Sequence, residues 1–299
     1  MPFLLLLALA LTVGLSVGLL AWRYPRIARP TATPALDTAR KVGETVRRHP
    51  SLRSFLDARL DPAAATGLAL TAAMVVAIGA GVLFGALAYL TRTNSTLTGI
   101  DNGVAKWGNS HASALSMHAL NDVTQLGGIY AIIVLCLVLA TAETIRERSV
   151  WVIPFIVAVM GGEEILTATV KQLADRLRPT FNPAAATLGP SFPSGHSATA
   201  AAFYATAALL LGRWRGRPAR AALIGLAVGI AVAVAASRVL LDVHWLSDVI
   251  AGLALGWGWF AVCAIAFGGR ILRFGAAAET AARVARRPSV SARSQNTSK

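Results

Sequence analysis

The sequence predicts an all-α, polytopic membrane protein, a bundle of about seven transmembrane helices, on three observations. Hydrophobic residues make up 55% of the 299 residues and charged residues only 14%, against about 25% charged in a typical soluble domain. The apolar residues gather in seven long runs, and a helix needs about 20 such residues to cross the roughly 30 Å hydrocarbon core of a membrane. The basic residues lie mainly in alternate connecting segments. Together these observations exclude an ordinary soluble globular domain.

The seven apolar runs organise the chain around one membrane domain. They lie near residues 3–22, 67–90, 126–142, 150–170, 196–212, 221–239 and 249–268. The first run has no basic residue before it and is longer than the apolar stretch of a usual secretory signal peptide, so we interpret it as an uncleaved anchor rather than a cleaved signal. The expected parts are an N-terminal anchor (1–22), a basic segment (23–66), a membrane domain (67–268) and a basic, disordered tail (269–299).

The basic residues predict the orientation of the chain. The sequence has 28 Lys and Arg against 14 Asp and Glu, a formal net charge of +14. Of the 28 basic residues, 22 lie in the segments 23–66, 143–149, 213–220 and 269–299, and six lie in the alternate segments. Because basic loops stay in the cytoplasm, the amino terminus is expected outside and the tail inside. Orientation and attraction to anionic lipid explain the positive charge, so we expect no nucleic-acid partner.

The basic segment 23–66 contains a short pattern of its own. Leu52, Phe55, Leu56 and Leu60 recur at helical spacing, which is typical of an amphipathic helix that lies on the membrane surface. The prolines of the same segment favour a loosely ordered basic linker equally well. Both interpretations therefore stay open.

Charged residues near membrane depth are costly, so each one is a candidate for function. The first group of them follows the fourth apolar run, where Lys171 and Arg178 stand seven residues apart. If the helix continues through this segment, both side chains lie on one face about 10 Å apart along the axis. Two such cations are able to clamp a phosphate. The alternative is that both side chains simply reach out to the membrane interface.

The second group is Pro193-Ser194-Gly195-His196, directly before the fifth apolar run. Ser194 is a good N-cap, Gly195 allows close approach of the backbone, and the free N–H groups at a helix start favour an anion. His196 then lies within reach of whatever binds there. Taken alone, this motif is weak, because many capped helices begin with these residues.

The third group contains Arg238, His244 and Asp248. The spacing of four between His244 and Asp248 allows the carboxylate, on a helix, to accept from one imidazole nitrogen and to leave the other lone pair free. No Ser or Cys is placed as a nucleophile, so the histidine itself is able to attack. The alternative is a structural His–Asp cap of the seventh helix.

Together the three groups resemble the type 2 phosphatidic-acid phosphatase superfamily, which contains membrane lipid phosphatases and the vanadium haloperoxidases. The pattern of that family is K-x6-R-P, then P-S-G-H, then S-R-x5-H-x3-D. This chain matches all eleven positions with Lys171, Arg178, Pro179, Pro193, Ser194, Gly195, His196, Ser237, Arg238, His244 and Asp248. The resemblance covers roughly residues 126–268 and implies a core of six helices. The run 3–22 and the segment 23–66 are additions to that core.

The resemblance also implies a mechanism. His244 is the nucleophile that forms a phosphohistidine, Asp248 orients it, and His196 protonates the leaving alkoxide and then activates water. The groups that hold the phosphate and stabilise its charge are Lys171, Arg178, Ser194, Gly195 and Arg238. No cofactor and no metal site are expected, because the sequence shows no ligand cluster for Mg²⁺ or Zn²⁺. Cys136 and Cys263 lie in apolar runs and behave as small hydrophobic residues.

These inferences predict a metal-independent lipid phosphatase in the cell membrane. It is expected to remove phosphate, on the outer face, from a phospholipid or a polyprenyl pyrophosphate, with the phosphorylated lipid and the surrounding membrane lipids as its partners. One alternative is a transferase that passes the phosphoryl or head group to another alcohol through the same site. An alternative of another class is a transporter or scaffold that binds phosphate without cleaving it.

Several further polar residues have weaker interpretations. Glu163 and Glu164 lie in the fourth apolar run, where interhelical hydrogen bonds are the favoured interpretation and tuning of the site cations is the alternative. Arg176 is expected to be solvated. The outer segment 91–122 is expected to be unspecific surface, or else to line an entrance for lipid. Asp242 and Trp245, which are neighbours of His244, are assigned no catalytic role.

Overall fold

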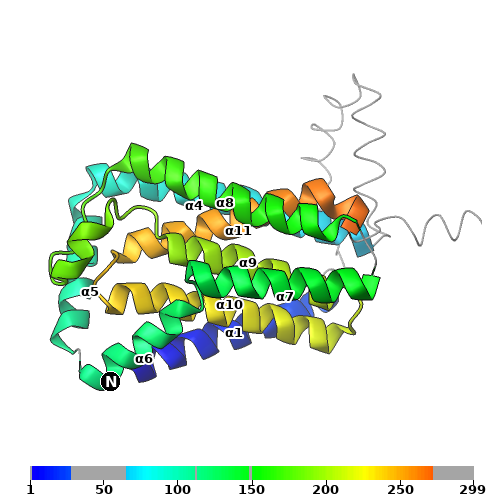
Figure 1. Ribbon diagram of the computed structural model, residues 1–299, viewed down its shortest axis with the longest axis horizontal. Helices are drawn as coiled ribbons and strands as arrows, with labels where there is room; N and C mark the ends of the chain where they lie inside the picture. Colours follow the sequence, from blue (N-terminus) through cyan, green and yellow to red (C-terminus); the bar gives the residue numbers. More distant parts are fainter. Residues whose placement is uncertain (1, 28–64, 112, 148–149, 272–299) are drawn as a thin grey trace, which may run out of the picture.

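The computed structural model describes residues 2–27, 65–111, 113–147 and 150–271, and it is all-helical over these residues, as the sequence predicts (Figure 1). Seven of its helices are long: α1 (Pro2–Ile27), α4 (Ala65–Thr93), α7 (Ile129–Glu147), α8 (Val152–Ala174), α9 (Gly195–Gly212), α10 (Arg217–Leu240) and α11 (Leu246–Ile271). Three shorter elements are α5 (Ser95–Ser110), α6 (Ala114–Gln125) and the 3-10 helix η1 (Pro183–Leu188). The amphipathic helix expected near residues 52–60 and the tail beyond residue 271 lie outside the described residues.

Each of the seven predicted runs forms one long helix, but α9 differs from the others. Within the described residues, six helices are long and apolar enough to cross a membrane, namely α1, α4, α7, α8, α10 and α11. The seventh, α9, contacts α7, α8, α10 and α11 and lies inside the bundle (Figure 1). Because protein surrounds α9, polar side chains such as His196 and Thr206 avoid contact with hydrocarbon. The chain is a multi-pass membrane protein.

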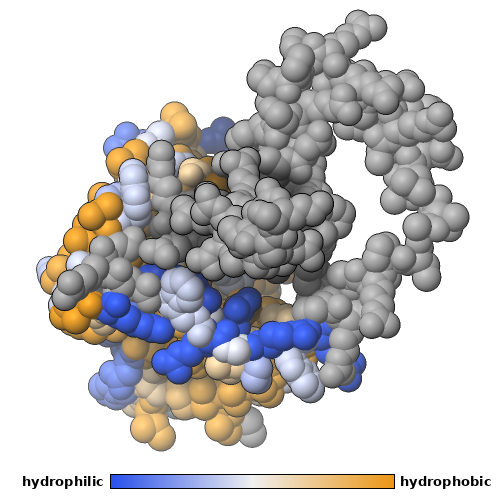
Figure 2. All heavy atoms as spheres, turned by 90° about the vertical axis from the view of Figure 1, so that its right-hand side faces the viewer, coloured by the Kyte–Doolittle hydropathy of each residue, from blue (hydrophilic) through white to orange (hydrophobic). Residues whose placement is uncertain are grey.

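The outer surface of the bundle has the polarity that a membrane requires. Apolar side chains of the peripheral helices are largely exposed, among them Leu11 at 62%, Val75 at 66% and Leu137 at 63%. Exposing such a surface to water would be unfavourable, whereas contact with lipid tails carries no such cost. Figure 2 looks onto one end of the bundle, where hydrophilic side chains gather between apolar flanks. The basic segment 213–220, between α9 and α10, is at this end of the bundle (Figure 1).

Small residues allow the long helices to approach one another closely. A Cβ atom on Gly225 of α10 would lie 2.6 Å from the carbonyl oxygen of Gly14 in α1, so only glycine fits there. On the other side of the bundle, a Cβ atom on Gly252 of α11 would lie 2.5 Å from the carbonyl oxygen of Ser194 at the start of α9. Such contacts are typical of helix packing in membranes. The N-terminal helix is therefore packed along α10, and α11 is held against the start of α9.

Candidate active site

The three polar groups of the sequence meet at one end of the bundle. The ends of α8 and α10 and the starts of α9 and α11 lie at this end, and α5 and α6 cover it (Figure 1). The amino terminus of α1 also lies there, whereas the segment 213–220 lies at the opposite end. Alternating helix directions thus bring residues together that are more than seventy positions apart in the sequence.

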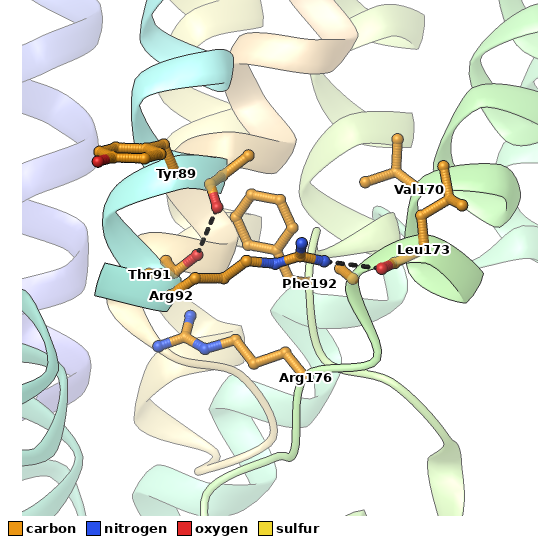
Figure 3. Close-up of a pocket in the computed structure, with 9 residues that line it drawn as sticks. Tyr89, Thr91, Arg92, Val170, Leu173, Arg176 and Phe192 are labelled. Carbon is orange, nitrogen blue, oxygen red and sulfur yellow. Dashed lines mark hydrogen bonds between the residues drawn. The ribbon is translucent and has the colours of Figure 1, made fainter. Parts of the chain in front are cut away.

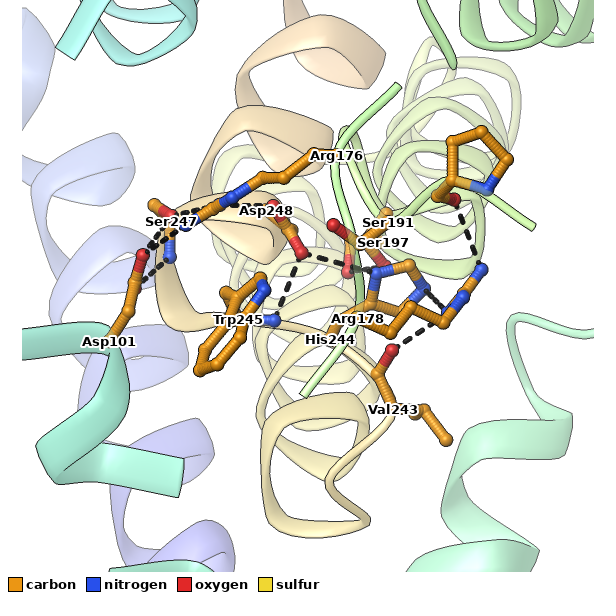
Figure 4. Close-up of polar contacts among 12 residues, drawn as sticks. Asp101, Arg176, Arg178, Ser191, Ser197, Val243, His244, Trp245, Ser247 and Asp248 are labelled. Carbon is orange, nitrogen blue, oxygen red and sulfur yellow. Dashed lines mark hydrogen bonds and ion pairs between the residues drawn. The ribbon is translucent and has the colours of Figure 1, made fainter. Parts of the chain in front are cut away.

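His244 lies between a carboxylate and a guanidinium in the turn that joins α10 to α11. Its ring is buried, with Nδ1 3.6 Å from Oδ2 of Asp248 and Nε2 3.2 Å from Nη1 of Arg178 (Figure 4). A guanidinium can only donate hydrogen bonds, so Nε2 accepts and the ring proton is on Nδ1, which faces Asp248. This arrangement leaves Nε2 as the basic and nucleophilic nitrogen of the ring.

The electrostatic environment keeps the His244 ring neutral. Burial lowers the pKa of His244 to about 4, against the opposing influence of Asp248, which raises it, while Arg178 and Arg238 lower it further. At neutral pH the imidazole therefore carries no charge, and the lone pair on Nε2 accepts from Arg178.

Arg178 occupies a loop, not the helix face that the sequence analysis expected. Helix α8 ends at Ala174 because Asp175 adopts a left-handed conformation with φ 44° and ψ 40°, and the following Pro179 also disfavours helix at Arg178. The predicted shared helix face of Lys171 and Arg178 is therefore wrong. Instead, the buried Arg178 donates to the carbonyl oxygens of Gly189 at 2.8 Å and Val243 at 2.7 Å. These hydrogen bonds hold the loop before α9 against the turn that carries His244.

Two other cations and the second histidine come from three different helices. Lys171 lies in the last turn of α8, Arg238 in the last turn of α10 and His196 in the first turn of α9. The charges of these groups lie close enough to interact with one another and with Arg178. The buried Nε of Arg238 has no hydrogen-bond partner among the described residues. Because an unmatched buried donor is costly, Arg238 offers a place for an anionic oxygen.

The start of α9 provides a second place for an anion. Ser194 stands at the N-cap position, as expected, but its side chain makes no capping hydrogen bond and instead accepts from Oγ of Ser197 at 2.9 Å. The backbone N–H of Ser194 donates to the carbonyl oxygen of Asp248 at 3.0 Å. The N–H groups of the first helical turn, which begins at Gly195, have no partner within the helix. They point out of the positive end of the helix dipole, where an anion binds favourably.

Three residues of the site were not found by sequence reasoning. Arg176, expected to be solvated, is only 16% exposed and forms ion pairs with Asp101 and Asp248, so that expectation is wrong. The outer segment expected as unspecific surface folds into α5 and α6, which bring the buried Asp101 and Thr124 to the site. Thr124 accepts from Nη1 of Arg238 at 3.3 Å. The sequence did contain one indication that Asp101 has a role, because it is an acidic residue in an outer segment with few charges.

A pocket of about 380 Å³ lies beside the site, between α4 and α8 (Figure 3). Its lining is mostly apolar, with Tyr89, Val170 and Phe192, and it contains the guanidinium groups of Arg92 and Arg176. Arg92 donates to the carbonyl oxygen of Leu173 at 2.7 Å. An apolar pocket with cations at its edge has the polarity of an amphiphile with an anionic head group.

Two polar features remain: the buried Glu163 of α8 and the side chains that could hold a metal ion. Glu163 is buried and accepts from Thr167 at 2.7 Å and from Thr199 of α9 at 3.1 Å, so it makes the interhelical hydrogen bond that was the favoured interpretation. Within the part of the chain that the structure describes, no group of three or more His, Cys, Asp or Glu side chains is placed to hold a metal ion.

Comparison with known proteins gives consistent matches. The model of the PAP2 superfamily matches residues 151–271. Phosphatidylglycerophosphatase B of Bacillus subtilis (strain 168) is 32% identical over 140 residues, which are 46% of this chain and 68% of that protein. The lipid A 1-phosphatase of Rhizobium etli is 47% identical over 72 residues, but these are only 24% of this chain and 27% of the relative.

A solved structure gives the same result. The crystal structure of the first transmembrane PAP2 type phosphatidylglycerolphosphate phosphatase from Bacillus subtilis superposes with a TM-score of 0.60 at 26% identity, over 67% of this chain and 99% of that chain. A membrane bundle that gathers two histidines, a carboxylate and several cations at one end defines the class, an integral-membrane phosphoric-ester hydrolase. The chain belongs to the PAP2 superfamily, and its homologues are membrane lipid phosphatases.

Proposed function

We propose that this protein hydrolyses a phosphate monoester or pyrophosphate of a phospholipid or polyprenyl carrier, at the outer face of the membrane, through a phosphohistidine on Nε2 of His244. The observation that carries the proposal is the placement of His244, whose ring has Asp248 at Nδ1 and Arg178 at Nε2. That placement presents a neutral nucleophilic nitrogen next to several cations.

The first chemical step forms the phosphohistidine. Nε2 of His244 attacks phosphorus as the bond to the lipid alkoxide breaks. His196 is protonated when the negative charge of the bound phosphate offsets the surrounding cations, and it gives the leaving oxygen a proton. The positive charge that develops on the imidazole is stabilised by Asp248 beside the Nδ1 proton. Arg238, Lys171 and the free amides of α9 stabilise the phosphoryl oxygens, which is the main requirement of phosphoryl transfer.

The second step releases phosphate and restores the enzyme. His196, now neutral, accepts a proton from a water molecule whose oxygen attacks phosphorus. The bond between phosphorus and Nε2 breaks, and its electron pair returns to His244. Inorganic phosphate leaves, and His196 is protonated for the next cycle. The chain's own side chains supply the nucleophile, the acid and the base, so no step requires a metal ion or cofactor.

The substrate class is tested by phosphate release. Purified protein in detergent is expected to release phosphate, in excess EDTA, from at least one of phosphatidic acid, phosphatidylglycerol phosphate and undecaprenyl pyrophosphate. Glycerol 3-phosphate, which has no acyl chain to occupy the apolar pocket, serves as the control and is expected to react far more slowly. Activity that disappears in EDTA and returns with Mg²⁺ would contradict the mechanism, and equal rates for glycerol 3-phosphate would contradict a lipid substrate.

The outer-face location is tested by cysteine labelling. The 22-to-six distribution of basic residues supports an outward-facing site end. Leu115 of α6 is 82% exposed at the site end, and Trp214 is 51% exposed at the opposite end. In a background without Cys136 and Cys263, Leu115→Cys is expected to react with a membrane-impermeant maleimide on intact cells. Trp214→Cys is expected to react only after lysis, and the reverse pattern would refute the orientation.

A further inference from the structure

The two carboxylate oxygens of Asp248 have different partners. Oδ2 faces Nδ1 of His244 and accepts from the backbone N–H of Trp245 at 3.0 Å. Oδ1 accepts from Nη1 of Arg176 at 2.6 Å (Figure 4). The carboxylate is buried, so these contacts determine its orientation. One oxygen therefore serves the nucleophile while the other is held by a guanidinium.

The guanidinium of Arg176 is itself held in place. Its Nη2 donates to Oδ2 of Asp101 at 2.8 Å, and its Nη1 donates also to Oγ of Ser247 at 2.7 Å. Its central carbon lies 5.6 Å from the ring of Trp245, within cation–π range. Arg176 thus bridges two carboxylates, each from a different helix, and has little freedom to move.

Asp101 contacts both Arg176 and the start of α11. Its Oδ1 accepts from the backbone N–H of Ser247 at 3.0 Å, and its Oδ2 accepts from Oγ of Ser247 at 2.6 Å. An acidic group that accepts from the first turn of a helix stabilises that turn. Asp101 is 1% exposed, so the contact is shielded from solvent. Helix α5 therefore holds the turn of α11 from which Asp248 projects.

The charges of this cluster depend on Arg176. Two buried carboxylates face one guanidinium, and buried charges are tolerated only when they are paired. Without Arg176, Asp101 and Asp248 would remain as two neighbouring carboxylates with no cation between them. Asp248 would then keep the Trp245 N–H on Oδ2 but would lose the donor on Oδ1, so its orientation beside His244 would be held less firmly.

We propose that Arg176 and Asp101 are positioning residues for the phosphatase reaction, which act through Asp248 to orient His244. This inference rests on the proposed function, because it assigns the nucleophile to His244. Neither residue belongs to the eleven motif positions, and Arg176 contacts Asp248 with Nη1 and Asp101 with Nη2. Residues that touch Asp248 but not the phosphate should affect the rate of the chemical step more than the binding of substrate.

The test compares Arg176 with an arginine that lies far from the site. Arg176→Met is expected to lower kcat about 10²-fold, the usual cost of misplacing a catalytic group, with KM changed less than threefold. Arg217→Met removes an exposed guanidinium at the start of α10, at the opposite end of the bundle, and is expected to leave kcat within threefold of the wild type. Arg176→Lys keeps the charge and is expected to recover at least tenfold in kcat over Arg176→Met.

A second comparison separates positioning from simple loss of structure. Asp101→Asn is expected to lower kcat about tenfold, and the double variant with Arg176→Met is expected to lose less than the product of the two single effects, because the pair acts as a unit. Thermal melting in detergent is measured beside each assay. The inference is overturned if Arg176→Met keeps wild-type kcat, if its loss of rate matches its loss of folded protein, or if the two effects multiply. Wild-type activity in His244→Ala would instead overturn the proposed function.

Discussion

Replacing His244 by Ala is expected to reduce phosphate release by at least about 10³-fold, because the variant has lost the atom that attacks phosphorus. The second readout is covalent labelling. Wild-type protein quenched during turnover of a ³²P-labelled lipid phosphate is expected to carry acid-labile, base-stable radioactivity, as phosphohistidine does, whereas the variant is expected to carry none. The His244 ring is buried and neutral, so its removal leaves a cavity but no unpaired charge on that residue.

The matched control for this variant is His118→Ala. His118 lies on α6 with an exposed side chain, and its removal is expected to leave phosphate release within a factor of two of wild type. His244→Gln, which fills more of the space, is expected to be as inactive as His244→Ala. Label that remains in His244→Ala would assign the nucleophile to another residue.

Replacing His196 by Ala is expected to slow hydrolysis of a lipid phosphate by about 10²–10⁴-fold, the usual contribution of a general acid–base. The size of the effect should depend on the leaving group. A lipid alkoxide needs a proton as it departs, whereas p-nitrophenolate does not. With p-nitrophenyl phosphate the variant is expected to give a rapid burst of p-nitrophenolate, followed by slow turnover, because phosphoenzyme accumulates when no base activates water.

The amplitude of that burst is the decisive measurement. An amplitude close to the concentration of enzyme would place His196 in both steps of the reaction. If the variant lost p-nitrophenyl phosphate and lipid turnover equally, without a burst, His196 would not be the group that protonates the leaving oxygen. Double replacement of His196 and His244 is expected to abolish the burst, because no nucleophile remains to hold the phosphoryl group.

The long helices were predictable because each one is specified by its own residues. The run 221–239, for example, became α10 (Arg217–Leu240), and the run 249–268 became α11 (Leu246–Ile271). A segment that crosses hydrocarbon must be predominantly apolar and must satisfy its own backbone hydrogen bonds, so the pattern is local. The same holds for the motif residues, whose short spacings within a group place His244 and Asp248 near each other.

Helix endings and the outer segment were less predictable. The end of α8 depends on a left-handed residue at Asp175, which no hydrophobic periodicity indicates. The segment 91–122 has little apolar pattern, and it forms α5 and α6 against the open end of the bundle. Asp101 gains its partners only through this packing. Its role in the site could not be inferred from its neighbours in the sequence.

The sequence alone therefore determined the membrane class, the number of long helices and the eleven motif positions, because apolar length and short-range spacing are properties of local segments. Only the tertiary structure decided which groups meet. In the structure, Arg178 lies in a loop and not on a helix face, and Arg176 is only 16% exposed. Arg176 connects Asp101, 75 residues before it, to Asp248, 72 residues after it. The physical reason is that a buried charge takes its partner from whichever element packs against it, and that element is chosen by the packing of the whole bundle.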